Sequence, residues 1–183
     1  MMNIPIDNII KTERLEIKSY QDMDQAAMIA LLTNEEIKKS FMIPDFQTEA
    51  EAILMFNRLQ DFSYDNQHFE RGIYLNQRLI GFVNDVEIED GTIELGYVIH
   101  PMFHNKGYAT EMLSAVIDVL FQQGFTQIVA GAFENNLASI KVMQHCGMTK
   151  MVKEDDITYQ GEVHHCLYYA IRNVINNANA EDL

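Results

Sequence analysis

Hydrophobic and polar positions alternate with two different periods along the chain, and the period predicts where strands and helices lie. Residues 14–20 (RLEIKSY) alternate apolar and polar side chains, which is typical of a half-buried strand. Residues 22–41 and 48–62 instead repeat apolar side chains at helical spacing. The helix caps expected from sequence are Asp22 for the first helix and a capping box of Thr48 and Glu51 for the second.

The pattern changes in the middle of the chain, where residues 71–99 read as three consecutive strands joined by tight turns. One β-α-β unit then lies inside an otherwise antiparallel arrangement, which predicts a mixed α+β domain rather than a doubly wound one. We expect a single domain spanning residues 1–183, with a polar tail at 174–183. The remaining predicted elements are a helix at 107–123, a strand at 127–133, a helix at 136–146, and strands at 151–159 and 162–172.

Composition narrows the class of protein. The chain carries 13 Lys and Arg against 27 Asp and Glu, for a formal net charge of −14. Such a surface repels nucleic-acid phosphates and attracts cations, so either a cationic partner or solubility alone accounts for it. We expect no nucleic-acid partner, and no apolar run is long enough to predict membrane association. With no secretion signal, and with Cys146 and Cys166 at no framework spacing, a cytoplasmic protein is expected.

The segment FHNKGYAT (103–110) joins a predicted strand to a predicted helix. Such a junction directs backbone N–H groups and a helix N-terminus at one point, which suits a phosphate group. Gly107 and Ala109 are small enough for a ligand to approach the backbone. The segment is neither a Walker A loop nor a GxGxxG fingerprint. Taken alone, it favours an ordinary strand-to-helix connection.

This segment resembles the pyrophosphate loop of the GNAT superfamily of acyl-CoA N-acyltransferases, whose pattern is Gln/Arg-x-x-Gly-x-Gly/Ala. Gly107 and Ala109 match the pattern, and His104 stands where Gln or Arg is usual. Further segments are similar to the RimJ/RimL-like branch, the ribosomal-protein N-terminal acetyltransferases, over about residues 9–173. They are IIKTERLEIK, LIGFV, IELGYVI, HNKGYATEM, NNLASIKVMQHCGM and GEVHHCLYYAI.

The resemblance implies a mostly antiparallel GNAT fold and acetyl-CoA as the cosubstrate, with no metal ion. In this superfamily the pantetheine arm pairs with a freed strand edge, here 97–99, and the N–H of Val98 or Ile99 would face the thioester carbonyl. The loop would hold the pyrophosphate on its main-chain N–H groups. The coenzyme-binding residues implied are Val98, Ile99, His104, Asn105, Lys106, Gly107, Tyr108, Ala109, Thr110 and Asn136.

The catalytic residues are less clearly marked. Many superfamily members have a Tyr acid where this sequence has Met143, whereas the Ser proposed for the task in the RimJ/RimL-like branch corresponds to Ser139. Ser139 is alternatively a first-turn helix residue bonded to the backbone. Glu94 and Glu70 are the candidate bases, Glu87 is a third choice, and a water chain is the alternative to any of them.

The last strand carries His164 and His165, and the branch usually has an acidic residue at the second position. We expect no metal site at this pair because no third ligand accompanies it.

We therefore expect an N-acetyltransferase that moves an acetyl group by direct transfer to a primary amine, with a protein or peptide N-terminus on a cationic partner as the favoured acceptor. A small-molecule acetyltransferase acting on a polyamine-type amine is the first alternative. A non-catalytic acyl-CoA-binding module is the second, because of Met143. Either a monomer or a homodimer is compatible with the sequence.

Overall fold

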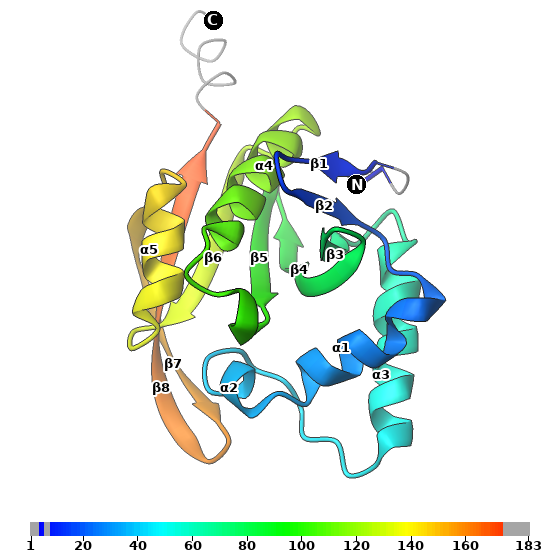
Figure 1. Cartoon of the computed structure of the whole chain (residues 1–183). Coiled ribbons are helices and arrows are strands. Elements are labelled where there is room, and N and C mark those ends of the chain that lie inside the picture. Colours follow the sequence, from blue (N-terminus) through cyan, green and yellow to red (C-terminus); the bar gives the residue numbers. More distant parts are fainter. Residues whose placement is uncertain (1–3, 6–7, 174–183) are drawn as a thin grey trace, which may run out of the picture.

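One eight-stranded sheet organises the computed structural model, which describes residues 4–5 and 8–173 (Figure 1). The strand order is β1-β2-β3-β4-β5-β6-β8-β7, and β5 and β6 are the parallel pair. The mixed, mostly antiparallel α+β fold expected from the sequence is confirmed, whereas the predicted tail at 174–183 lies outside the described residues. The strands are β1 (Ile10–Lys11), β2 (Leu15–Lys18), β3 (Glu70–Leu75), β4 (Arg78–Glu89), β5 (Thr92–Ile99), β6 (Gln127–Phe133), β7 (Thr149–Tyr159) and β8 (Glu162–Arg172).

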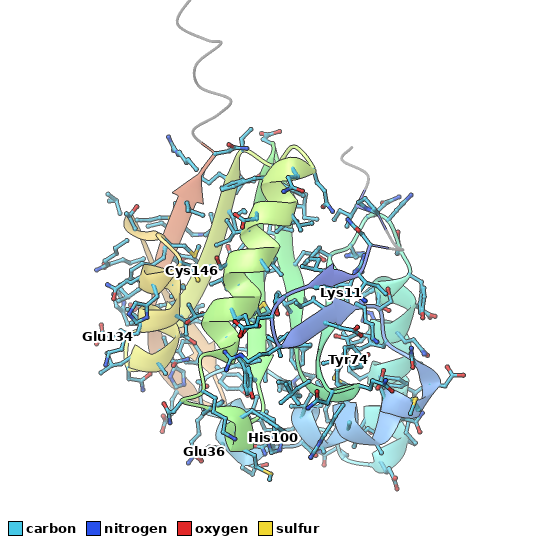
Figure 2. All side chains as sticks on the ribbon, turned by 45° about the horizontal axis from the view of Figure 1, so that its top comes forward. Lys11, Glu36, Tyr74, His100, Glu134 and Cys146 are labelled. Carbon is cyan, nitrogen blue, oxygen red and sulfur yellow. The ribbon has the colours of Figure 1, made fainter. Side chains whose placement is uncertain are left out.

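Helices cover both faces of this sheet. On one face, α4 (Tyr108–Gln122) runs lengthwise over the central strands with α5 (Leu137–His145) beside it (Figure 2). Side chains of these two helices pack against Ile93 and Leu95 of β5. The helices α1 (Gln25–Leu32), α2 (Glu35–Lys38) and α3 (Glu49–Ser63) pack on the other face, against residues that include Val98. Strand β5 is therefore buried on both sides, because alternate side chains point to opposite faces.

Three hairpins are closed by two-residue turns of the same geometry. Asn76 and Gln77 both have positive φ, 49° and 64°, as expected for a type I′ turn between β3 and β4. The turn at Asp90 and Gly91 joins β4 to β5, and Gln160 and Gly161 join β7 to β8, again with positive φ at each residue. The predicted turns are thus confirmed, and they set the register of the antiparallel strands.

The helix predicted at 22–41 is not continuous. A 3-10 turn at Asp22–Asp24 leads into α1, and α2 begins anew at Glu35. The helical periodicity continues across the break, but the Asn34 side chain accepts hydrogen bonds from the N–H groups of Glu36 and Ile37 and so caps a second helix. The expected cap at Asp22 is wrong, since Gln21 occupies the N-cap position of the first turn.

The second predicted helix agrees more closely, since α3 begins after Thr48, whose hydroxyl accepts from the Glu51 N–H at 3.3 Å. The Glu51 carboxylate bonds back to the N–H of Gln47, one residue before the expected partner. In the part of the chain that the structure describes, no helix is both long and apolar enough to cross a membrane.

Candidate active site

The parallel strands β5 and β6 separate partway along their length. Their pairing runs from Thr92 and Gln127 to Leu95 and Ala130. Beyond that point β5 continues to Ile99 paired only with β4, and β6 continues paired with β8. The backbone of the last residues of β5 is therefore left with an open edge toward β6, as the resemblance implied.

The direction of the backbone groups on that edge follows from the hydrogen bond that ends the β4–β5 ladder. The N–H of His100 donates to the Ile80 carbonyl at 2.8 Å, so residue 100 faces β4. Because successive residues of a strand direct their N–H groups to opposite edges, Val98 also faces β4, whereas Tyr97 and Ile99 face the gap. Of the two donors left open by the sequence, Ile99 is the one on the free edge.

The loop after β5 brings a helix N-terminus to the same place. Asn105 and Gly107 both have positive φ, 60° and 80°, and Gly107 is the N-cap residue of α4. The first backbone bond of the helix runs from the Glu111 N–H to the Gly107 carbonyl. The N–H groups of Tyr108, Ala109 and Thr110 precede that bond and have no helical carbonyl to bond, which makes them available to an anion.

A pocket of about 440 Å³ joins the strand gap to this helix start. Most of the residues expected to bind the coenzyme line it, together with Ser139. The predicted site residues that it brings together are Val98, Ile99, His104, Asn105, Gly107, Tyr108, Ala109, Thr110, Asn136 and Ser139.

Lys106 is not among the lining residues. Its Nζ turns back to the Met102 carbonyl at 3.2 Å and lies over the Phe103 ring. The His104 ring is fixed differently, with Nε2 2.6 Å from the Ile99 carbonyl. A ring nitrogen that donates to this carbonyl ties the loop to the end of β5.

Asn136 and Ser139 form one hydrogen-bonded unit at the start of α5. The Asn136 side-chain oxygen accepts from the Ser139 N–H at 3.2 Å, and its nitrogen donates to the Ser139 hydroxyl oxygen at 3.1 Å. Asn136 therefore caps the helix. Because the serine oxygen accepts the bond from Asn136, its own proton remains available to another acceptor.

Glu94 lies on β5 two residues before Gly96, which lines the pocket. Its side chain is only 16% exposed, and Lys153 Nζ lies 4.0 Å from its carboxylate. Burial raises the pKa of Glu94, the nearby Lys153 ammonium opposes that rise, and the carboxylates of Glu87 and Asp155 add to it. Glu94 is not among the residues that line the pocket. A carboxyl group with a raised pKa nevertheless has the property that a general base needs.

Glu70, the other candidate base, is not brought to the pocket. It is the first residue of β3 and is buried beneath Tyr20, whose hydroxyl donates to its carboxylate. Burial raises the pKa of Glu70 to about 8, against the opposing effect of the Tyr20 bond. The neighbouring Arg71 is also buried and donates to the carbonyls of Ser63, Glu70 and Pro5. This arrangement ties α3 and the N-terminal segment to the sheet.

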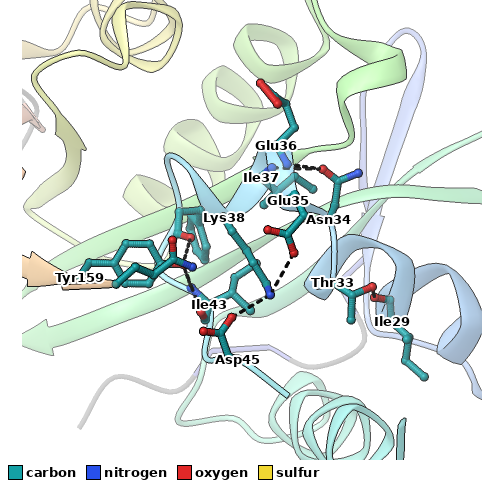
Figure 3. A network of polar contacts seen from close by, with 12 residues as sticks. Ile29, Thr33, Asn34, Glu35, Glu36, Ile37, Lys38, Ile43, Asp45 and Tyr159 are labelled. Carbon is teal, nitrogen blue, oxygen red and sulfur yellow. Dashed lines mark hydrogen bonds and ion pairs between the residues drawn. The ribbon is translucent and has the colours of Figure 1, made fainter. Parts of the chain in front are cut away.

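The wall opposite the coenzyme loop comes from α2 and the segment after it, which lie within the helical stretch 22–62 that the sequence assigned to the acceptor wall. Glu36, Ile37, Ser40 and Phe41 line the pocket there. Figure 3 shows how this segment is held: Lys38 bonds to Glu35 and Asp45, and the Tyr159 hydroxyl reaches the backbone near Ile43. The Lys38 contacts are local, whereas Tyr159 belongs to β7 and lies 116 positions from Ile43 in the chain.

Met143 occupies the position at which many superfamily members have a tyrosine acid, and it is part of the hydrophobic core. Met143 is fully buried, and Val142 lines the pocket instead. Tyr97 on β5 also lines the pocket, and its hydroxyl donates to the Ser139 carbonyl at 3.3 Å. Burial raises the pKa of the Tyr97 hydroxyl, so it stays protonated. Cys146 beyond it is half-buried, and burial raises the pKa of its thiol to about 11, which disfavours a nucleophilic thiolate.

The two histidines of β8 point to opposite faces of the sheet. His164 stacks on the Phe133 ring at 4.4 Å between centroids. His165 contacts the carboxylates of Asp156 and Glu154, and the bond to Asp156 raises the pKa of His165 despite partial desolvation. The paired histidines thus have separate local partners.

A comparison with protein-family models adds an independent observation to this geometry. The model described as "Acetyltransferase (GNAT) domain" matches residues 14–149. The chain belongs to the GNAT acetyltransferases. The assignment to this superfamily made from the loop and the element order is confirmed, and with it the assignment to acetyl-CoA-dependent acetyltransferases.

Individual GNAT proteins show the same relationship. The uncharacterized N-acetyltransferase YoaA of Bacillus subtilis is 26% identical over 147 residues, which cover 78% of this chain and 83% of YoaA. A GNAT-family acetyltransferase of Bacillus anthracis has a crystal structure that superposes with a TM-score of 0.76, at 26% identity, over 90% of this chain and 98% of that one.

A ribosomal-protein acetyltransferase shares the fold. The structure of RimL, a ribosomal L7/L12 alpha-N-protein acetyltransferase in complex with coenzyme A, superposes with a TM-score of 0.76 over 90% of this chain and 98% of RimL. At 18% identity, the likeness to RimL is one of fold.

Proposed function

We propose that this GNAT protein acetylates the N-terminal amine of a cationic protein or peptide, using acetyl-CoA bound in the pocket between β5 and α4. The observation that carries the proposal is that the open edge of β5 and the unbonded N–H groups of α4 face one pocket. The pantetheine arm can thus pair with the backbone edge of β5, and the pyrophosphate can bind the N–H groups of α4 in the same pocket.

In this proposal the pyrophosphate lies on the N–H groups of Tyr108, Ala109 and Thr110, where the helix dipole favours negative charge. The pantetheine arm extends β5 by pairing with the backbone of Tyr97 and Ile99, as an added strand does. The Ile99 N–H then donates to the thioester carbonyl and stabilises the oxyanion that forms on attack.

In this proposal two side chains carry out the proton transfers. Glu94 takes a proton from the acceptor amine, directly or through a water, because its raised pKa lies closer to that of the amine. Ser139 returns a proton to the departing coenzyme A thiolate, because Asn136 holds its oxygen and leaves its proton free. The nitrogen–carbonyl bond forms as the carbon–sulfur bond breaks, and no acyl-enzyme is needed.

The acceptor enters past the wall formed by α2 and the segment after it. Glu36 and Ser40 line this wall, and the Glu94 carboxylate lies farther along β5. A net charge of −14 favours a cationic acceptor. The fold is shared with RimL, a ribosomal L7/L12 alpha-N-protein acetyltransferase, which supports a protein N-terminus as the acceptor.

The test is thiol release from acetyl-CoA against three acceptors: a basic peptide with a free Ser or Ala N-terminus, the same peptide with its N-terminus blocked, and spermidine. Release with the free peptide alone supports the proposal, and mass spectrometry should then place the acetyl group on the α-amine. Release with spermidine alone would replace the peptide by a polyamine-type acceptor. Acetyl-CoA binding without release on any amine of a wider panel would favour a non-catalytic binding module.

A further inference from the structure

The turn between β1 and β2 reaches across to the start of α4. Its Arg14 side chain contacts the Glu111 carboxylate through Nε and Nη2, each at 2.6 Å, although the two residues are 97 positions apart in the chain. The Arg14 N–H and the Thr12 hydroxyl donate to the other Glu111 oxygen, at 2.8 and 2.5 Å. Glu111 is in the first turn of α4, so this turn of the helix is fixed from outside its own sequence.

The same guanidinium also holds the loop before the helix. Arg14 Nη1 donates to the Lys106 carbonyl at 3.0 Å, and the guanidinium carbon lies 4.5 Å from the centre of the Tyr108 ring. Because a trans peptide directs its C=O and N–H to opposite sides, this bond orients the peptide plane that joins Lys106 to Gly107. Arg14 therefore touches the chain on both sides of Gly107, the left-handed N-cap residue.

The burial of Glu111 shows that the contact is an ordered one. Its side chain is 17% exposed, and although partial burial favours the neutral acid, the bonds from Thr12 and Arg14 lower the pKa of Glu111. Arg14 is not among the residues that line the pocket, and its three donating nitrogens are engaged by Glu111 and Lys106. Its effect on a ligand is therefore transmitted through the shape of the loop rather than by direct contact.

We propose that Arg14 is a positioning residue for the coenzyme: it holds residues 105–110 in the conformation that presents the N–H groups of α4 to the pyrophosphate. This inference rests on the proposed coenzyme site. Figure 2 shows the β1–β2 hairpin beside α4, where this clamp operates. The part of acetyl-CoA affected is the pyrophosphate end, while the thioester end, bound along β5, is untouched.

A truncated cosubstrate distinguishes effects at the pyrophosphate end of acetyl-CoA from effects at the thioester end. S-acetylpantetheine carries the thioester and the pantetheine arm but lacks the pyrophosphate and the nucleotide. The Arg14→Gln variant should raise the KM for acetyl-CoA about ten- to hundredfold, the range that a small misplacement of a binding group produces, and leave the KM for S-acetylpantetheine unchanged. Glu111→Gln should give the same selective loss, and the double variant should lose little more, because the two residues act as one unit.

Lys11→Gln is the matched control, since it breaks an ordinary exposed ion pair with Glu16 at 3.5 Å on the same hairpin. It should change neither KM. Thermal unfolding of each variant checks that it is folded. Equal weakening of both cosubstrates in Arg14→Gln, or no weakening of either, would overturn the inference. If the wild-type protein itself uses both cosubstrates equally well, the coenzyme site fails and the inference fails with it.

Discussion

Leu95 of β5 and Ala130 of β6 form the last pair between these two strands. Beyond this pair β5 remains paired with β4, and β6 remains paired with β8. This one register position explains why the pocket lies where it does. A parallel pair that stayed closed to Ile99 would satisfy the backbone edge internally and leave no partner for an extended ligand. The positions that follow the last pair, Gly96 of β5 and Gly131 of β6, both line the pocket and carry no side chain.

Replacing Ser139 by Ala tests the proposed acid. Turnover should fall about a hundredfold or more, the usual contribution of a positioned acid, while the KM for acetyl-CoA stays nearly constant. Ser114→Ala is the matched control, because Ser114 is an exposed serine of α4 outside the pocket lining. Steady-state kinetics of both variants make the comparison, and an unchanged kcat in Ser139→Ala would return this serine to a purely structural role at the start of α5.

Glu94→Gln tests the proposed base through the pH profile. The wild-type kcat/KM should rise with pH as the Glu94 carboxyl, whose pKa is raised by burial, loses its proton and begins to accept one from the amine. The variant should be slower at every pH and keep only the titration of the acceptor itself. Glu87→Gln, at the paired position on β4, provides the comparison. If wild type and Glu94→Gln had the same pH dependence of kcat/KM, a water molecule rather than Glu94 would be the general base.

Glu70 should make the stability of the folded protein depend on pH. Its pKa is about 8 in the folded state against an ordinary value of 4.5, so the folded protein binds more protons between these values. Stability from this group is fully present below about pH 4.5 and is lost as pH rises toward 8. Glu70→Gln removes this titration. The Tm of Glu70→Gln minus the Tm of wild type should therefore increase by several °C between pH 5 and pH 8, since each kcal/mol of unfolding free energy shifts Tm by about 2–4 °C.

Thermal unfolding of wild type, Glu70→Gln and the exposed-site variant Glu162→Gln at intervals across that range measures the effect. The Glu162→Gln curve should run parallel to the wild-type curve. A wild-type Tm that rose relative to Glu70→Gln over the same interval would mean that Glu70 is ionised in the folded protein.

The features predictable from the sequence were those set by near neighbours in the chain. Positive-φ turns at Asn76 and Gln77 and at Gln160 and Gly161 follow from short polar residues between alternating strands. The strand-to-helix junction at Gly107 follows from a glycine directly ahead of an amphipathic helix. Asn136 and Ser139 likewise meet because three positions along a helix start bring side chain and backbone together.

The features that escaped prediction depend on contacts between distant segments. The hydrophobic period runs through Asn34 unbroken, and only its side-chain bonds end one helix and start another. Glu70 looks like an exposed strand-end carboxylate until Tyr20 is folded over it. The clamp of Arg14 on Glu111 joins residues 97 positions apart, a distance over which the sequence of one chain carries no local signal.

Titration of acetyl-CoA into wild-type protein, Gly107→Glu and Gly161→Glu tests the central claim most directly. Both glycines have a left-handed backbone, with φ of 80° and 79°, so both substitutions introduce similar strain, but only Gly107 lies at the pocket. The account predicts that Gly161→Glu binds acetyl-CoA like wild type, whereas Gly107→Glu, with bulk and negative charge added to the loop that presents the N–H groups of α4, loses more than about a hundredfold in affinity. Unchanged affinity in Gly107→Glu would contradict it.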